Sequence, residues 1–412
     1  IPRFTFEKFS TTPEILGTSM KSVGEAMAIG RNFKESLQKA LISLEVGFSG
    51  LDKIFYLNKK EIEKKLKENI PNKILLIAEA IRKKIKISKI HKLSNVDPWF
   101  LEQIEEIVNT ENNILKKGLP KNFNEFNKIK SMGFSDKRLS QLCNLEEKII
   151  RRKRLALNIF PVFKKVDTCA AEFKSFTPYM YSTYQRSFML KTECEAKPSS
   201  RKKIIILGGG PNRIGQGIEF DYCCCQASFS LKEAGYETIM INCNPETVST
   251  DYDTSDRLYF EPLVEEYVHN IILKEKSKGN LVGIIAQFGG QTPIKLAKFL
   301  YKNSLPILGT QYSSIDLAED RDRFRKLLIK LKLKQANSGI AKSYNEAIKI
   351  AKKIGLPLVV RPSYVLGGRA MEIVHEKSQL KNFVEEAFKA AENNPILIDK
   401  FINNAMEVDV DA

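Results

Sequence analysis

The chain has 412 residues, which is long for one hydrophobic core, so two to four domains are expected. Apolar residues make up 43% and charged residues 28%, as in an ordinary globular protein. No apolar run approaches the roughly 20 residues that span a bilayer, and the start Ile-Pro-Arg-Phe has no signal-peptide pattern. Because the first residue is not Met, we expect a fragment or a processed piece.

The net charge of +17 raises the question of a nucleic-acid or acidic-membrane partner. The basic residues are scattered between carboxylates, however, and the run Lys-Lys-Glu-Ile-Glu-Lys-Lys at 59–65 is typical of a solvated helix face. We therefore expect a lysine-rich surface, with neither nucleic acid nor membrane as a partner.

The seven cysteines include the run Cys223-Cys224-Cys225 but no Cys-x-x-Cys, and the three histidines lie far from them in sequence. A zinc site is therefore not indicated. The pattern favours reduced thiols in a cytoplasm.

The first half of the chain reads as helical. Apolar spacing over 36–44 predicts a helix, but residues 1–47 have too little core to stand alone and resemble the tail of a domain that begins upstream. In the segment 48–160, Asp97 predicts a helix N-cap with Pro98 at the first position. This segment carries no catalytic signature, which favours a structural role or an interface.

One stretch of this segment has the pattern of a helix-turn-helix, with helices at 135–142 and 145–157 and a break near Asn144. Its second helix carries the basic run 151–154, and DNA-reading helices are basic. Four consecutive residues point in four directions around a helix, so DNA binding stays a weak alternative.

Residues 161–200 are rich in Pro, Ser, Thr and aromatics and predict a connector laid against domain surfaces. From residue 202, strands alternate with helices, which predicts a parallel α/β sheet. The expected strands are 203–207, 238–241, 258–260, 282–287 and 306–308, with a helix at 223–234. A new unit begins near 311, with helices at 320–331, 344–354 and 379–393, strands at 358–361, 371–375 and 396–399, and an alternating strand over 406–412.

A glycine-rich loop at 208–217 follows the first of these strands, so that its backbone N–H groups can face an anion. It fails the dinucleotide template, because Arg213 stands where the third glycine belongs, and it lacks the Gly-Lys-Ser/Thr of a P-loop. Gly209 and Gly210 offer backbone donors, and Asn212 and Arg213 offer side-chain donors to a small carboxylate or carbamate. Tight strand–helix packing is the alternative role of the glycines.

The run Gly-Gly-Gln-Thr-Pro at 289–293 follows the strand that ends at 287, at the edge where ligands of parallel sheets bind. Gly290 and Gln291 are candidates for a second anion contact there, and a simple helix cap is the alternative.

A second glycine-rich loop, 361–371, lies between two strands and predicts a glycine-tipped hairpin. Gly367 and Gly368 can place N–H groups on phosphate oxygens, and Arg361 and Arg321 add charged donors. The alternative is an ordinary hairpin with solvated arginines.

The last strands offer an adenine slot at 398–402, in which the backbone reads the base edge and Ile402 is an apolar neighbour. Glu407 can hold a ribose hydroxyl. A solvent-facing edge strand is the alternative.

Seven motifs together resemble the large chain of carbamoyl-phosphate synthetases, over essentially the whole chain. They are Met20–Arg31, Val166–Phe173, Gly208–Cys224, Asn242–Glu261, Gly289–Pro293, Glu319–Phe324 and Arg361–Glu372. The resemblance implies a ligase. A glutamine amidotransferase small subunit supplies ammonia, the first half phosphorylates bicarbonate and forms carbamate, and the second half phosphorylates carbamate with a second ATP. The carbamoyl phosphate serves arginine and pyrimidine biosynthesis.

The resemblance also implies site residues and cofactors. ATP, with Mg²⁺ or Mn²⁺, is expected to contact Arg321, Arg361, Gly367, Gly368, Lys400, Ile402 and Glu407, of which Arg321 and Arg361 are the catalytic candidates. Lys400 is the loosest match, because other ATP-grasp enzymes often carry Glu there. The path of the carbamate is expected to pass Gly209, Gly210, Asn212, Arg213, Gly290 and Gln291.

The expected fold is α/β: a helical oligomerisation domain, then a parallel-sheet pre-ATP-grasp domain of Rossmann type, then an incomplete ATP-grasp domain. The boundaries are 1–47 for the tail of a first ATP-grasp domain, 48–198 for the helical domain and connector, 199–310 for the pre-ATP-grasp domain and 311–412 for part of a second ATP-grasp domain. Self-association is expected through the helical domain. The family's metal ligands are expected beyond Ala412, so we predict that these residues alone bind metal–ATP poorly and do not turn over.

Two alternatives to this function stay open. Another ATP-grasp enzyme, such as a biotin carboxylase relative, shares the order of the loops but does not need the long helical segment before residue 200. A non-catalytic interaction fragment would act through the helical segment instead.

Overall fold

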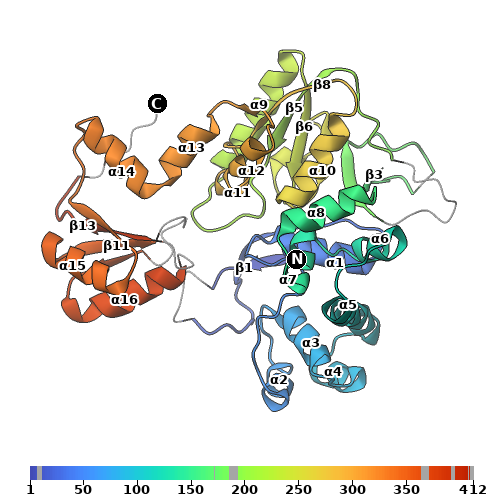
Figure 1. Ribbon diagram of the computed structural model, residues 1–412, viewed down its shortest axis with the longest axis horizontal. Coiled ribbons are helices and arrows are strands. Elements are labelled where there is room, and N and C mark those ends of the chain that lie inside the picture. Colours follow the sequence, from blue (N-terminus) through green and yellow to red (C-terminus); the bar gives the residue numbers. More distant parts are fainter. Residues whose placement is uncertain are drawn as a thin grey trace. The chain divides into compact units, whose positions relative to one another are not determined.

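The computed structural model describes residues 1–6, 12–170, 172–184, 194–362, 371–390, 395–406 and 408. The chain folds into two compact units, the first made mainly of residues 11–213 and 217–309 and the second mainly of residues 310–412. Figure 1 shows both units and labels most of their helices and several of their strands. No helix among the described residues is long and apolar enough to cross a membrane.

The first unit begins with a two-stranded antiparallel hairpin and a helix. These are β1 (Pro2–Phe4), β2 (Ser22–Glu25) and α1 (Phe33–Ser43). The Asn32 side chain caps α1 by accepting a hydrogen bond from the Glu35 amide at 2.9 Å. The helix predicted at 36–44 is thus confirmed.

A helical block follows, made of helices α2 to α8. They are α2 (Lys59–Lys65), α3 (Lys73–Arg82), α4 (Ile87–Ser94), α5 (Pro98–Lys117), α6 (Phe123–Ser131), α7 (Asp136–Cys143) and α8 (Glu147–Ala156). The predicted N-cap of α5 is confirmed, since the Asp97 side chain accepts a hydrogen bond from the Trp99 amide at 2.8 Å.

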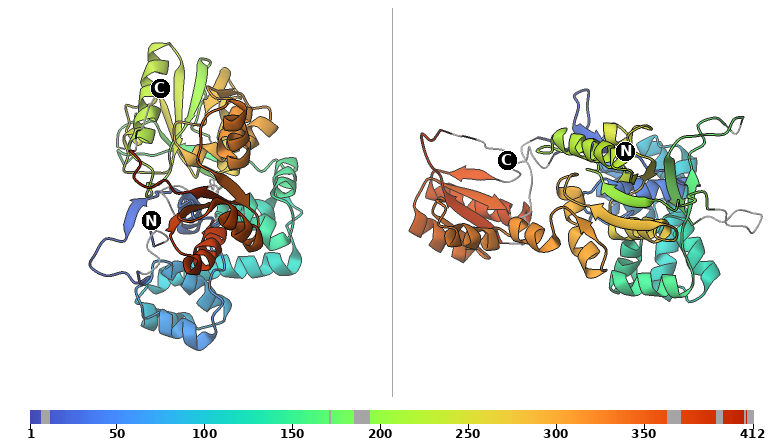
Figure 2. Two further views of the ribbon diagram at one scale, coloured as in Figure 1. Left: turned by 90° about the vertical axis from the view of Figure 1, so that its left-hand side faces the viewer. Right: turned by 90° about the horizontal axis from the view of Figure 1, so that it is seen from above.

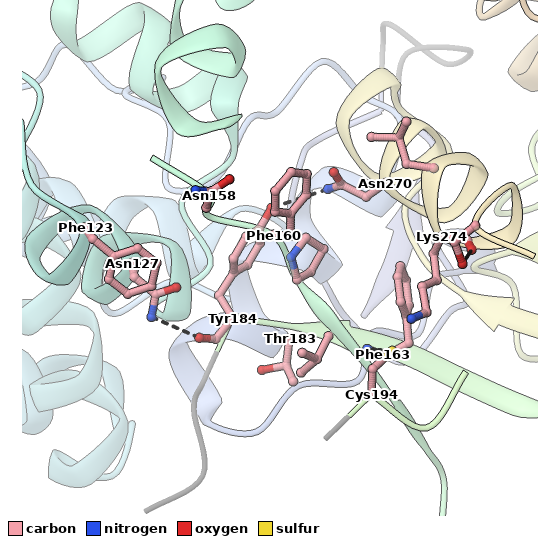
Figure 3. A pocket seen from close by; sticks show the side chains of 14 residues that line it. Phe123, Asn127, Asn158, Phe160, Phe163, Thr183, Tyr184, Cys194, Asn270 and Lys274 are labelled. Atoms are coloured by element: carbon pink, nitrogen blue, oxygen red, sulfur yellow. Dashed lines mark hydrogen bonds between the residues drawn. The ribbon is translucent and has the colours of Figure 1, made fainter. Parts of the chain in front are cut away.

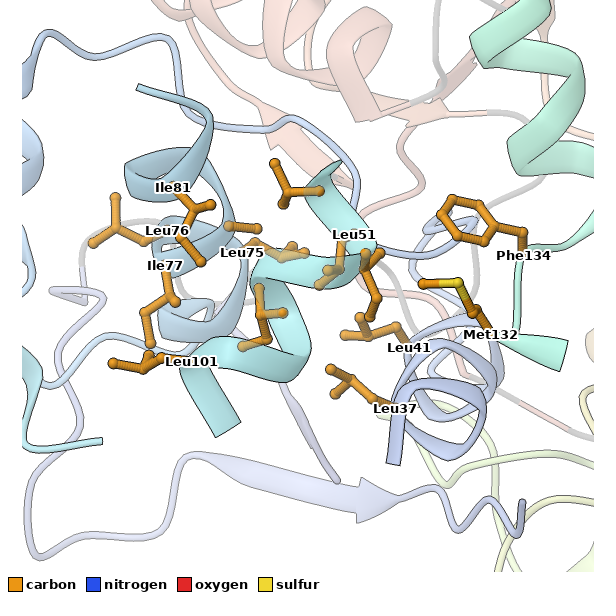
Figure 4. Close-up of a cluster of buried hydrophobic side chains, with 14 of the residues drawn as sticks. Leu37, Leu41, Leu51, Leu75, Leu76, Ile77, Ile81, Leu101, Met132 and Phe134 are labelled. Carbon is orange, nitrogen blue, oxygen red and sulfur yellow. The ribbon is translucent and has the colours of Figure 1, made fainter. Parts of the chain in front are cut away.

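One hydrophobic core joins α1 to the helical block. Leu37 and Leu41 of α1 belong to the same buried cluster as Leu75 and Leu76 of α3 and Leu101 of α5 (Figure 4). The shared core explains how a segment as short as 1–47 is stabilised, because its apolar helix face is buried against helices that follow it in sequence.

In the basic run 151–154 on α8, both end residues form ion pairs within the first unit. Arg154 is fully buried, and its Nη2 lies 2.9 Å from Asp136 Oδ2. Arg151 pairs with Glu265 at 3.0 Å, and only the two residues between these arginines are exposed. The helices of the predicted helix-turn-helix are present, but this charge arrangement argues against a DNA-reading face.

A sheet of seven described strands forms the centre of the rest of the first unit. The strands are β3 (Val162–Lys165), β4 (Tyr179–Thr183), β5 (Lys202–Leu207), β6 (Glu237–Asn242), β7 (Arg257–Phe260), β8 (Asn280–Ile285) and β9 (Ile307–Leu308). Their order is β3-β4-β7-β6-β5-β8-β9, and each neighbouring pair is parallel except β3–β4. The predicted parallel sheet is confirmed, and β5 is almost wholly buried as a central parallel strand should be.

The predicted connector over 161–200 is more ordered than expected, because it supplies β3 and β4 to this sheet. The short strands were missed since their aromatic and polar residues do not alternate cleanly. Helices of the sheet region are α9 (Glu219–Glu233), α10 (Glu265–Glu275), α11 (Gln291–Ile294) and α12 (Ala297–Lys302), with a 3₁₀ turn at Val248–Thr250.

The second unit is built on an antiparallel sheet in the order β10-β13-β11-β12. Its elements are α13 (Tyr312–Glu319), α14 (Arg321–Lys330), β10 (Ser338–Ala341), α15 (Tyr344–Ile354), β11 (Leu358–Pro362), β12 (Glu372–Val374), α16 (Lys377–Ala390) and β13 (Ile396–Lys400). Its buried core joins α15 and α16 to the sheet, and the right-hand view of Figure 2 shows these helices on one side of it. The predicted hairpin is confirmed by the β11–β12 pairing, while most of the strand predicted at 406–412 lies outside the described residues.

Candidate functional site

In the second unit, Arg361 and Asp399 form an ion pair on one face of the sheet, with Arg361 Nε 3.1 Å from Asp399 Oδ2. In the pairing of β11 with β13, Arg361 lies opposite Leu397, and Val359 lies opposite Asp399. The side chains of these four residues therefore project from the same face of the sheet. The alternate residues of both strands point to the other face and are buried against α15 and α16. The sheet therefore presents the ion pair on the face away from its own helices.

Arg321 lies near this pair, at the first position of α14. The Asp320 side chain caps the helix by accepting hydrogen bonds from the next two amides, both at 3.0 Å. Burial and the charge of Arg361 lower the pKa of Arg321, while Asp399 acts in the opposite direction. Burial also raises the pKa of Asp399, against the pull of Arg361 and Arg321. Arg361 and Arg321 thus both act on Asp399, and Glu319 also acts on Arg321. Paired guanidinium groups are well suited to bind phosphate oxygens.

Lys400 takes the other face of the sheet. It lies opposite Leu358, which belongs to the helix-covered core, and its ammonium donates to the carbonyls of Gly355 and Leu356 at 3.3 and 2.6 Å. The Lys400 side chain is thus hydrogen-bonded to main-chain carbonyls that directly follow α15. Ile402 follows β13 and is 61% exposed. Gly367, Gly368 and Glu407 lie outside the described residues.

In the first unit, the glycine loop after β5 is held by its neighbours. Gly210 has a φ of +69°, a backbone conformation that favours glycine, and its amide donates to Asn242 Oδ1 at 3.0 Å. Asn212 accepts a hydrogen bond from the Asn244 side chain at 3.3 Å, and Gly209 also takes part in an interaction. The loop therefore has a defined shape at the carboxyl edge of the parallel sheet.

Arg213, predicted as an anion donor, is paired with a carboxylate that the sequence analysis did not identify. Arg213 Nη2 lies 3.0 Å from Glu45 Oε2 and also contacts the Thr292 hydroxyl, which donates to the same Glu45 oxygen at 2.7 Å. Gly290 and Gln291 directly precede Thr292, at the start of α11. The structure thus brings both predicted anion-contacting segments together, around Glu45.

Burial raises the pKa of Glu45, against the opposing effects of Arg213 and of the Thr292 hydroxyl. The other carboxylate oxygen, Oε1, is buried without a hydrogen-bond partner among the described residues. Glu45 was missed because a single carboxylate between Leu44 and Val46 gives no motif, and its partners lie far away in sequence.

No cluster of three or more His, Cys, Asp or Glu side chains that could hold a metal ion is found in the part of the chain that the structure describes. Arg321 and Arg361 offer guanidinium donors of the kind that bind phosphate oxygens.

Three family models match consecutive parts of the chain. Residues 25–158 match "Carbamoyl-phosphate synthetase large chain, oligomerisation domain", residues 200–317 match "Carbamoyl phosphate synthase preATP-grasp domain", and residues 320–412 match "Carbamoyl-phosphate synthase L chain, ATP binding domain". The fold class is therefore α/β, with a helical oligomerisation domain followed by a parallel-sheet pre-ATP-grasp domain and ATP-grasp sequence, as predicted.

Curated relatives match over the full length of the chain. Large chains of carbamoyl phosphate synthase from Brucella melitensis and Haemophilus ducreyi are each 53% identical to it, and that from Ralstonia nicotianae is 54% identical. In each case all of this chain is covered, together with 38%, 37% and 38% of the relative, respectively. These matches define the class of the chain by its sequence: it carries an ATP-binding domain of the carbamoyl-phosphate synthase type. The chain belongs to the carbamoyl phosphate synthase large chain family, of whose members it spans about 38% in length.

Among solved structures, the biotin carboxylase domain of the Hydrogenobacter thermophilus 2-oxoglutarate carboxylase is 24% identical, with a TM-score of 0.37, over 50% of this chain and 45% of that one. The matches over the whole chain and the oligomerisation model over 25–158 favour the synthase family over the alternative of a biotin carboxylase relative.

Proposed function

We propose that the chain is the central part of the large subunit of a glutamine-hydrolysing carbamoyl phosphate synthase. The complete enzyme makes carbamoyl phosphate from bicarbonate, glutamine-derived ammonia and two ATP, for arginine and pyrimidine biosynthesis. Residues 320–412 contribute to the half that phosphorylates carbamate. The observation that carries this proposal is 53% identity to curated large chains along the entire sequence.

The role of the second unit in ATP binding is supported by the two guanidinium groups that act on Asp399. Arg361 and Arg321 are proposed to bind the phosphates and to stabilise the charge that develops during phosphoryl transfer. Gly367 and Gly368 are proposed to cover the phosphates with backbone N–H groups, and Glu407 to hold the ribose. Mg²⁺ or Mn²⁺ is proposed to enter with the nucleotide.

The adenine is proposed to lie along the segment after β13. Ile402 supports this role because it exposes an apolar side chain there. Since the Lys400 ammonium is bound to backbone carbonyls of residues 355 and 356, the contact of Lys400 with the base is proposed to come from its main chain.

The carbamate path is proposed to run along Gly209, Gly210, Asn212, Arg213, Gly290 and Gln291. Their gathering at the carboxyl edge of the parallel sheet supports this role. Because Arg213 is neutralised by Glu45, we assign it to shaping the path rather than to capturing an anion.

The proposed partners are the glutamine amidotransferase small subunit and further copies of the chain, through the helical domain. We propose the same domain boundaries as in the sequence analysis. They are 1–47 for the tail of the first ATP-grasp domain, 48–198 for the helical domain and connector, 199–310 for the pre-ATP-grasp domain and 311–412 for part of the second ATP-grasp domain. All seven cysteines are free, which supports a reducing compartment such as the cytoplasm.

The proposal is tested in the complete large chain assembled with its small subunit, by running the last step in reverse and measuring ATP formed from carbamoyl phosphate and MgADP. Arg361→Gln and Arg321→Gln are each expected to lower the rate by at least about 100-fold. Arg323→Gln is the matched control on α14, since Arg323 pairs with the exposed Asp316. Equal rates for all three variants would contradict the assignment.

A further inference from the structure

A cavity of about 370 Å³ lies inside the first unit, where the helical block meets the seven-stranded sheet (Figure 3). Its walls come from α6, from the segment between α8 and β3, from the end of β4 and from α10. It lies outside both candidate sites described above. Its volume falls at the lower end of the range for small-molecule sites.

Aromatic side chains form the apolar part of the wall. Phe163 is buried, and its ring is fixed by an edge contact with Tyr259 at a centroid distance of 5.1 Å. Phe160 lines the same cavity and remains 48% exposed. A flat ring placed against Phe160 would cover apolar surface that now faces water.

The polar part of the wall has a fixed orientation. The Tyr184 hydroxyl donates to the Glu266 carboxylate at 3.2 Å, so it must accept the hydrogen bond from Asn270 Nδ2 at 3.3 Å. The Asn270 amide is thereby oriented, and its Oδ1 is left buried without a partner in the part of the chain that the structure describes. Asn270 is only 5% exposed and lines the cavity through a side chain that is held in place by Tyr184.

The charge of the wall is positive. Lys274 lies one helical turn beyond Asn270 on the same face of α10 and also lines the cavity. Among the described residues that line the cavity there is no Asp or Glu. We propose that this cavity is a binding site for a small aromatic anion.

The site is tested on the 412-residue chain with 1-anilinonaphthalene-8-sulfonate, a fluorescent aromatic sulfonate with an N–H group. Lys274→Glu reverses the cavity charge, and Lys276→Glu, at the exposed C-cap of the same helix, is the matched control. We expect Lys274→Glu to weaken probe affinity at least about tenfold and Lys276→Glu to change it less than about twofold. Equal affinities for the two variants would place the probe elsewhere and overturn the proposal.

Cys194 lines the cavity and supplies a second readout that reports position, while the exposed Cys223 serves as its control. Saturating probe is expected to slow iodoacetamide alkylation of Cys194, measured by peptide mass spectrometry, and to leave Cys223 unchanged. An unchanged rate at a reactive Cys194 would refute the site. If Cys194 reacts too slowly in the free protein, the proposal is judged only by the ratio of probe affinities of Lys274→Glu and Lys276→Glu.

Discussion

Glu45 and Arg213 form a buried ion pair between positions that are 168 residues apart, with Oε2 and Nη2 separated by 3.0 Å. The Thr292 hydroxyl bonds to the same carboxylate oxygen at 2.7 Å. The pair therefore ties the end of α1 to the glycine loop after β5 and to α11. The shape of the proposed carbamate path thus depends on a side chain from the opposite end of the first unit's sequence.

A double-mutant cycle with Glu45→Gln and Arg213→Gln measures this connection. Each single variant leaves one buried group without its ionic partner, so we expect the double variant to cost less than the sum of the two, by about 1–3 kcal/mol. Urea unfolding followed by fluorescence of Trp99, the single tryptophan, reports on the first unit. If the effects of the two substitutions on the free energy of unfolding were additive, the ion pair would not contribute to stability.

Arg154 tests whether the basic run on α8 is structural. Its guanidinium is fully buried, bonds to Asp136 and donates to the Ile159 carbonyl at 3.0 Å. Arg154→Met leaves Lys130, 3.0 Å away, as the remaining cation beside the buried Asp136 carboxylate, so we expect a loss of about 1.5–3 kcal/mol in the free energy of unfolding. The control is Arg152→Met, on the exposed side of α8, which should change stability by less than about 0.5 kcal/mol. If both variants lost similarly little stability, the buried Arg154 ion pair would not stabilise the fold.

His269 is expected to make stability depend on pH. Burial, helped by the charges of Arg151 and Arg154, lowers its pKa to about 4. Since this value lies below that of the unfolded chain, about 6.5, the unfolded chain binds the proton more tightly. Stability is therefore complete above about pH 6.5 and is lost as the pH falls toward 4.

His269→Gln removes this proton uptake, so the comparison isolates the histidine from all other titrating groups. Because the side chain is only half-buried, we expect the wild-type chain to lose about 2 kcal/mol more than the variant between pH 7 and pH 4.5. Urea midpoints at the two pH values provide the measurement. Parallel losses in both proteins would show that the folded and unfolded chains share one histidine pKa.

Local patterns predicted much of this fold. The apolar run of β5, the Asp97–Pro98 start of α5 and the hairpin around the second glycine loop follow from spacing and capping, which depend on near neighbours in sequence. The strands β3 and β4 were missed because pairing with distant segments holds them in the sheet: β4 pairs with β7, and β3 pairs with β4. Such contacts leave little trace in the strands' own sequence.

The same limit applies to the candidate sites. Glycines and arginines of the motifs were identifiable, but their partners Glu45 and Asp399 were not assigned roles, because only folding places those carboxylates beside Arg213 and Arg361. The sequence also did not predict which way these side chains point. Arg361 and Lys400 lie on opposite faces of one sheet, and this follows from the register in which β11 pairs with β13.

Lys400 therefore allows a prediction that separates a side-chain contact with ATP from a main-chain one. Its ammonium is held by the carbonyls of Gly355 and Leu356 on the helix-covered face. Lys400→Met keeps the backbone and the aliphatic stem but removes these hydrogen bonds. We expect a loss of about 1–3 kcal/mol in the stability of the second unit and a change of less than about twofold in MgATP affinity of the complete large chain. Calorimetric titration with MgATP, beside Arg361→Gln as the variant that should lose affinity, makes the comparison. If Lys400→Met weakens MgATP as much as Arg361→Gln does, the ammonium itself contacts the nucleotide and leaves its carbonyl partners on binding.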